Sequence, residues 1–378
     1  MSGHIGRFLL ILFSTLFVTG RQSIAGPLYS VVDLGNLGGT QMTAWSVNNS
    51  GVVSGYGTTA AGGTSGFIYD SGVLYGIGVG GGLDTKAYGV NANGQAAVNA
   101  NTNGYVYDNG ALQQLPGLGG TTTSATAIND SGQVVGMATT GSGAARAFLF
   151  SLSNLQSLGV LAGGNWSAAY GVNGAGVVVG YGDTAGGAFH GFVWTAGGGM
   201  ADIGTLGGAN SYAMNVNSSG VVTGHAQTAS GYLHAFVKAG GGLQDLGTLG
   251  GGNSYAYGIN VAGNVVGYSN TAGGDHAFVY SGGRLWDLNH ALTGGGGGWT
   301  LTNAYGVNAA GQIAGSGLYQ GAEHAFLLNP ISVVTGPSGS LASGVPEPDS
   351  FVLTGGALCA VSILLRKRIP RPEPEAEN

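Results

Sequence analysis

The sequence predicts an all-β protein whose central part is a closed seven-bladed β-propeller. Three observations lead to this fold class. One short phrase recurs seven times, each copy contains four strand-like segments, and the strand that the last copy lacks stands alone at the amino-terminal end. A repeat of about 40–45 residues with four strands has the size of a propeller blade.

The recurring phrase is hydrophobic-Asn-x-x-Gly. Its asparagines are Asn48, Asn91, Asn129, Asn173, Asn217, Asn260 and Asn308, separated by 43, 38, 44, 44, 43 and 48 residues. Glycine accepts positive φ, and asparagine bonds nearby backbone groups with its side chain. The phrase therefore predicts a tight hairpin in every copy, with a structural role for the asparagine.

Each copy contains short segments rich in Val, Phe and Tyr, bounded by Gly and Asn. The sixth copy has them at 257–260 (YGIN), 265–268 (VVGY) and 276–280 (HAFVY), and the fifth ends with 243–247 (LQDLG). This composition is typical of strands and turns. Each copy should therefore form one four-stranded blade.

The two ends of the repeat region predict how the ring closes. The last copy has segments at 305–308, 312–315 and 325–328 but no Asp-Leu-Gly strand, and that strand appears at 30–35. An amino-terminal strand that completes the last blade would remove the open edge of the sheet. The alternative is a β-solenoid, which also stacks repeats but usually has shorter coils and needs caps.

Composition restricts the function. Glycine accounts for 79 of 378 residues, charged residues for 7% and hydrophobic residues for 43%, so the chain should fold rather than stay disordered. The region 26–343 holds four basic residues against eleven acidic ones, which argues against nucleic-acid binding. The single cysteine, Cys359, lies in the carboxy-terminal apolar segment, so the repeats have no disulfide and no thiolate metal site.

Residues 1–25 are interpreted as a signal peptide. Arg7 precedes an apolar run at 8–18, and Ser23 and Ala25 supply the small residues of a cleavage site between Ala25 and Gly26. An uncleaved anchor helix is the alternative, but the run is shorter than the ~20 residues a membrane span needs.

The carboxy-terminal end has three parts in a fixed order. After a linker at 331–344 come Val345, Pro346, Glu347 and Pro348, then an apolar run at 351–365, then the basic cluster Arg366, Lys367 and Arg368. The prolines oppose strand pairing, and the basic cluster should stay on the cytoplasmic side. An ordinary carboxy-terminal membrane anchor is the alternative.

This order, over residues 345–368, resembles the PEP-CTERM sorting signal. The resemblance implies a Gram-negative bacterium, a transient membrane anchor and recognition by an exosortase, a membrane transpeptidase that acts near the Pro-Glu-Pro motif. Members of that family occur alongside exopolysaccharide genes. This chain departs from the pattern in continuing past the basic cluster with a charged Pro/Glu tail at 369–378.

The repeat region, 26–330, resembles the HAF family of bacterial extracellular repeats. The tripeptide His-Ala-Phe stands at 234–236, 276–278 and 324–326, with variants such as His190-Gly191-Phe192 and Arg146-Ala147-Phe148. The resemblance implies export and a repeat fold, and it carries no established chemistry.

No catalytic residue, metal site or cofactor is predicted. His190, His234, His276 and His324 share one repeat position, as do Asp33, Asp202, Asp245 and Asp287, which indicates bonds between strands rather than catalysis. His225 and His290 fall outside the repeat and remain possible site residues. The loop acids Asp84, Asp183, Asp275 and Glu323 show none of the close spacing that calcium loops need.

Aromatic residues are the remaining lead. Trp45, Trp166, Tyr212, Tyr255 and Tyr305 lie in or just before the first strand of their copies. Two interpretations stay open: stacking on sugar rings at a loop surface, or packing between blades, which we favour.

The sequence thus predicts a non-enzymatic protein of the cell surface or extracellular matrix. Its expected partners are the secretion machinery and exosortase, the membrane through its carboxy-terminal segment, and exopolysaccharide or matrix proteins. A protein–protein scaffold is a further possibility. The competing hypothesis, a secreted glycan-active propeller enzyme, predicts non-repeating Asp, Glu, His or Arg side chains around one mouth of the central channel.

Overall fold

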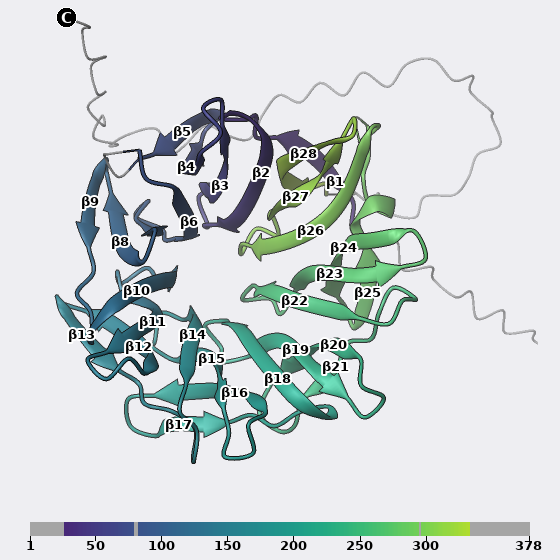
Figure 1. Ribbon diagram of the computed structural model, residues 1–378. Coiled ribbons are helices and arrows are strands. Elements are labelled where there is room, and N and C mark those ends of the chain that lie inside the picture. The colour runs from purple at the N-terminus through teal and green to yellow at the C-terminus, as the bar shows by residue number, and fades with distance from the viewer. Residues whose placement is uncertain (1–25, 79–81, 295, 333–378) are drawn as a thin grey trace, which may run out of the picture.

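The computed structural model describes residues 26–78, 82–294 and 296–332, and it is a seven-bladed β-propeller closed by its first strand (Figure 1). Each blade is a four-stranded antiparallel sheet. The predicted fold class is confirmed, and the β-solenoid is wrong.

Six blades follow the chain directly. Blade 1 contains β2 (Gly38–Val47), β3 (Val53–Thr59), β4 (Thr64–Asp70) and β5 (Val73–Ile77), and blade 2 contains β6 (Thr85–Val90), β7 (Ala96–Ala100), β8 (Asn103–Asp108) and β9 (Ala111–Gln114). Blade 3 contains β10 (Gly119–Ile128), β11 (Val134–Thr140), β12 (Ala145–Ser151) and β13 (Asn154–Ser157), and blade 4 contains β14 (Ser167–Val172), β15 (Val178–Asp183), β16 (Phe189–Thr195) and β17 (Gly199–Asp202). Blade 5 contains β18 (Gly207–Val216), β19 (Val222–Thr228), β20 (Leu233–Lys238) and β21 (Gln244–Asp245), and blade 6 contains β22 (Ser254–Ile259), β23 (Val265–Thr271), β24 (Gly274–Ser281) and β25 (Arg284–Asp287).

Blade 7 combines the two ends of the repeat region. Its strands β26 (Trp299–Val307), β27 (Ile313–Tyr319) and β28 (Ala322–Pro330) are completed by β1 (Tyr29–Asp33), which pairs antiparallel with β28. The predicted one-plus-three closure is therefore confirmed. Asp33 reaches His324 at 2.9 Å, so the closing strand also supplies a side-chain contact.

The blades pack through repeated apolar layers. Phe67, Phe148, Phe192, Phe236, Phe278 and Phe326 each occupy the same position in the third strand and are fully buried. The second strand carries a glycine beside this layer. At Gly267 an added Cβ would lie 1.8 Å from the Tyr255 carbonyl oxygen of β22, so only glycine allows the two strands this approach.

The seven repeat asparagines form a closed ring of hydrogen bonds. Each buried Nδ2 donates to the backbone carbonyl of the next asparagine around the propeller at 2.8–3.0 Å, and Asn308 donates to Asn48 and closes the circle. The Oδ1 atom of Asn217 accepts from the amides of Ser219 and Val221 in its own hairpin. The asparagine therefore shapes its turn and joins two blades at once.

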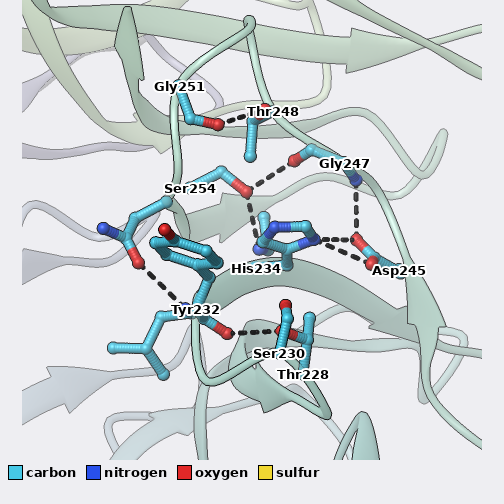
Figure 2. A network of polar contacts seen from close by, with 12 residues as sticks. Thr228, Ser230, Tyr232, His234, Asp245, Gly247, Thr248, Gly251 and Ser254 are labelled. Atoms are coloured by element: carbon cyan, nitrogen blue, oxygen red, sulfur yellow. Dashed lines mark hydrogen bonds and ion pairs between the residues drawn. The ribbon is translucent and has the colours of Figure 1, made fainter.

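A second set of contacts links neighbouring blades at the other end of the strands (Figure 2). Between blades 5 and 6, the Ser254 hydroxyl donates to the Gly247 carbonyl at 2.6 Å and accepts from the Ala235 amide at 2.8 Å. Beside it, His234 Nδ1 lies 2.8 Å from the Asp245 carboxylate. Thr85, Ser167 and Ser211 repeat the serine's contacts at three other junctions.

Candidate functional site

Every blade has a β-bulge in its first strand, three residues before the ring asparagine. In blade 1, Ala44 pairs with Gly55 and Ser46 with Ser54, so Trp45 is an extra residue with no partner opposite. A bulge bends the strand and redirects a side chain, and bulges are common beside functional sites. The same register shift recurs in all seven first strands.

We call these extra residues the bulge ring. It consists of Trp45, Tyr88, Thr126, Tyr170, Met214, Tyr257 and Tyr305, all of them partly exposed. The first strands are the innermost strands of the propeller (Figure 1). All seven side chains line one cavity of about 400 Å³ on the propeller axis. A volume of that order is typical of small-molecule sites, about 300–1,000 Å³.

One half of this channel is an aromatic wall from blades 6, 7, 1 and 2. Trp45 stacks on Tyr305 with ring centroids 4.4 Å apart and meets Tyr88 edge-on at 5.4 Å, and Tyr257 lies 5.2 Å from Tyr305. Burial raises the pKa of Tyr88 and of Tyr257 to about 12, so their hydroxyls are neutral at physiological pH.

The opposite half mixes apolar and uncharged polar groups, since Tyr170, Met214 and Ile128 lie beside Asn99 and Asn215 in the lining. Asn99 donates from Nδ2 to Ser124 Oγ and the Ala125 carbonyl, and its Oδ1 accepts from the Ala125 amide. Asn215 accepts from the Val216 amide through Oδ1. In the described part of the chain its Nδ2 has no hydrogen-bond partner, so this donor is available to a ligand. No Asp, Glu, His, Lys or Arg is among the described residues that line the cavity.

A line of aromatic rings leads out of the channel to the side where the first strands begin. From Tyr257 it passes through Tyr268, Tyr255, His225, Tyr212, Tyr181, Phe189 and Trp166, with neighbouring centroids 4.7–6.1 Å apart. We call these seven residues beyond Tyr257 the aromatic strip. Phe189 is 38% exposed, although it is a large apolar side chain. The asparagine ring lies at the opposite end of the first strands.

His225 lies within this strip and is the one off-repeat histidine that the fold brings near the channel. Its ring stacks on Tyr212 at 5.0 Å, and its Nδ1 atom is buried without a hydrogen-bond partner in the described structure. Burial lowers the pKa of His225 to about 4, so the imidazole is neutral at physiological pH. The other off-repeat histidine, His290, is 86% exposed and lies 3.5 Å from Asp287.

The repeat-position histidines and aspartates, for which the sequence indicates a structural role, lie within hydrogen-bond distance of each other. His190, His276 and His324 lie 2.6, 2.7 and 2.9 Å from Asp202, Asp287 and Asp33. Three of the loop acids are engaged in local contacts: Asp84 accepts from Thr64, Asp183 from Trp166 and Asp275 from Asn270. Over residues 26–78, 82–294 and 296–332, no group of three or more His, Cys, Asp or Glu residues could hold a metal ion.

The targeting segments lie outside the described residues. These are the signal peptide through Ala25, the linker beyond residue 332, the sorting motif and basic cluster at 345–368, and the tail at 369–378. No helix among the described residues is long and apolar enough to cross a bilayer.

Sequence reasoning identified only part of the channel. It singled out Trp45, Trp166, Tyr212, Tyr255 and Tyr305, which do contact rings of other residues, but at the channel and its rim rather than in a closed core. It missed Tyr88, Tyr170 and Tyr257. One signal could have found them, since the residue three places before the repeat asparagine is aromatic in five of seven copies.

Comparisons with known proteins agree on the fold. No family model matches the chain, and no curated protein is significantly similar to it in sequence. The β-propeller domain of the trilobed protease from Pyrococcus furiosus, which has an open velcro topology, matches at a TM-score of 0.51 and 9% identity over 77% of this chain and 94% of that domain. YCF48 bound to a D1 peptide matches at 0.50 and 11% over 83% and 98%.

A third similar structure is a puromycin-hydrolysing peptidase from Mycobacterium tuberculosis, at a TM-score of 0.51 and 13% identity. The match covers 77% of this chain and 52% of the peptidase. At such identities the likeness shows the propeller fold and leaves the activity of this chain open.

Proposed function

We propose that this chain is an exported, non-enzymatic binding module of the cell envelope or extracellular matrix. The observation that carries the binding role is the bulge ring: seven equivalent strands each direct one side chain into the same channel, and five of these side chains are aromatic. A rigid scaffold that presents partly exposed aromatic surface in a concave site is typical of ligand binding.

The location is proposed from the sequence. The leader at 1–25 directs the chain out of the cytoplasm, and the Pro-Glu-Pro motif, apolar run and basic cluster at 345–368 hold it in the membrane until an exosortase processes it. A cysteine-free repeat region with few charges also suits an exported protein that burial and backbone pairing stabilise. YCF48 is described with a bound peptide, but the binding role proposed here depends on the channel and not on that likeness.

The test of this proposal is mass spectrometry of the protein recovered from fractionated cells. We expect a mature chain that starts at Gly26, lacks the apolar run and occurs in the envelope or the medium. Replacing Pro346, Glu347 and Pro348 with alanine should leave the intact carboxy-terminal segment in the membrane fraction. An unprocessed chain confined to the cytoplasm would overturn the proposed location.

A further inference from the structure

We infer that the axial channel and the aromatic strip bind a neutral saccharide chain. This inference rests on the binding role proposed above and specifies the chemical class of the ligand. Four properties of the site point to this class of ligand: the ring surface and polar groups of the lining, the absence of charge among them, the mixed charge near neighbouring tyrosines, and the length of the aromatic line.

The lining requires a ligand with both an apolar face and polar edges. Trp45, Tyr257 and Tyr305 present ring surface on one side. On the other side Ser124 and Asn215 present hydroxyl and amide groups beside Tyr170 and Met214. A hydrocarbon or lipid tail would leave the Asn215 Nδ2 donor unpaired once water is displaced, which costs free energy. A sugar ring meets both requirements, because its C–H face covers aromatic surface and its hydroxyls accept or donate at the edge.

The absence of charged side chains in the channel lining argues against ionic ligands. The described lining holds no Asp, Glu, His, Lys or Arg, so an anion or cation inside would lose its hydration without gaining a counter-charge. Aromatic faces do attract cations. Choline is therefore one of the probes in the titration described below.

Charges of both signs lie near tyrosines of the first two strands of the blades. The Lys86 ammonium lies 4.7 Å above the Tyr56 ring. Burial, and then the nearby Glu323 carboxylate, raises the pKa of Tyr56, and burial, and then Asp275, raises the pKa of Tyr255. Charges of mixed sign favour neither an anionic polymer nor a cationic one.

The aromatic strip indicates a chain of several sugars rather than a single unit. It continues from Tyr257 through five further rings to Phe189 and Trp166, and these seven rings come from blades 4, 5 and 6. Phe189 would remain an exposed apolar side chain without a ligand. Sugars in the channel and sugars over Phe189 would therefore belong to one chain leaving the channel.

The experiment is calorimetric titration of the purified full chain with linear neutral oligosaccharides of gluco, manno, galacto and xylo type, each as a dimer and a hexamer. An oligogalacturonate hexamer, choline and a tyrosine-rich neutral peptide serve as the charged and non-sugar probes. We expect at least one neutral hexamer to bind more tightly than its dimer and than all three other probes.

Three variants locate the site. Trp45→Leu should weaken binding of both dimer and hexamer about tenfold, since it removes a stacking surface in the channel. Phe189→Ser should weaken the hexamer about threefold and leave the dimer unchanged. Tyr75→Ser removes a 52% exposed aromatic ring on the outer strand β5 and should change neither.

The inference fails if no neutral oligosaccharide binds at millimolar concentration, if choline, oligogalacturonate or the peptide binds more tightly, or if Tyr75→Ser weakens binding as much as Phe189→Ser. Phe189 is exposed, so its variant keeps the test valid even if Trp45→Leu does not fold. A protein that is exported and processed but binds no saccharide overturns this inference alone. A saccharide-binding protein found unprocessed in the cytoplasm overturns only the proposed location.

Discussion

The asparagine ring shows how one side chain can serve two purposes. Asn217 is buried, its Oδ1 accepts two amides of its own hairpin, and its Nδ2 donates to the Asn260 carbonyl of the next blade at 3.0 Å. Because water cannot replace these bonds inside the protein, the residue is difficult to substitute. That requirement explains why the same residue recurs in every blade.

Asn217→Ala should destabilise the protein by about 1–3 kcal/mol, since two amides lose their acceptor and the Asn260 carbonyl keeps only one of its two donors, the Gly263 amide. Urea unfolding followed by circular dichroism measures the loss. Ser218→Ala, at an exposed position in the same hairpin, is the matched control and should change the unfolding free energy by less than about 0.5 kcal/mol. Equal effects of the two variants would show that the ring adds nothing to stability.

His225 should make stability depend on pH. Burial lowers its folded-state pKa to about 4, below the ordinary value of 6.5, so the unfolded chain binds a proton more readily than the folded chain between these values. The unfolding free energy should therefore fall as the pH drops from 6.5 towards 4, and the full penalty is present below 4.

Asn99 of blade 2 occupies the position that His225 occupies in blade 5. His225→Asn should therefore be tolerated and should reduce the fall in unfolding free energy at low pH. Urea midpoints of the two proteins measured from about pH 7 to about pH 4.5 provide the comparison. The carboxylates titrate in both proteins, so only the difference between the curves reports on His225. If the urea midpoints of the two proteins fall in parallel as the pH drops, His225 does not contribute to the pH dependence.

At the scale of elements, the bulge determines what faces the channel. Strict alternation along β2 would continue the pattern of buried Met42 and Ala44 and turn every second residue outward. The extra residue Trp45 interrupts the pairing, and Val47 returns to the buried side. One insertion per blade thus adds an inward-facing side chain without disturbing the layers between blades.

The closing strand β1 is the other decisive element. Deleting residues 29–34 should expose the edge of β28 and cause partial unfolding or association, because unpaired strand edges recruit other chains. Moving the same residues to follow Pro330 through a short glycine–serine turn makes blade 7 continuous and should restore the fold. Light scattering and urea unfolding distinguish the two variants. Equal stability of both would show that β1 does not close the ring.

At the scale of the whole molecule, closure removes the end repeats that an open array would have. Every blade contacts two neighbours through its first strand and its apolar layers, and the last contact joins β26 to β2. The asparagine ring crosses the same junction, from Asn308 to Asn48. Opening any one blade therefore breaks two interfaces, which favours cooperative unfolding.

We expect a single unfolding transition. Tryptophan fluorescence and circular dichroism should give coincident urea curves, although Trp45 is in blade 1 and Trp194 is in blade 4. Asn91→Ala in blade 2 and Asn260→Ala in blade 6 should each shift that one transition to lower urea. Separate transitions, or a variant that moves only one probe, would indicate blades that unfold independently.

The sequence by itself determined the number of blades, the four strands in each and the closure by the first strand. The spacing of the repeat asparagines, the turn residues of each copy and the Asp-Leu-Gly strand at 30–35 predict these features, and all three can be read along the chain. It also indicated a structural role for the histidines and aspartates of the repeat, because each set recurs at one repeat position. That the two sets contact each other is seen only in the structure.

Only the tertiary structure decided what the channel contains. Which residue of a run such as Ala-Trp-Ser-Val is the bulge depends on its pairing with the neighbouring strand, and periodicity alone does not show it. The line of rings from Trp45 to Trp166 joins five blades, and His225 belongs to it although no neighbour in sequence marks it. These contacts exist because the ring brings the first strands together around one axis.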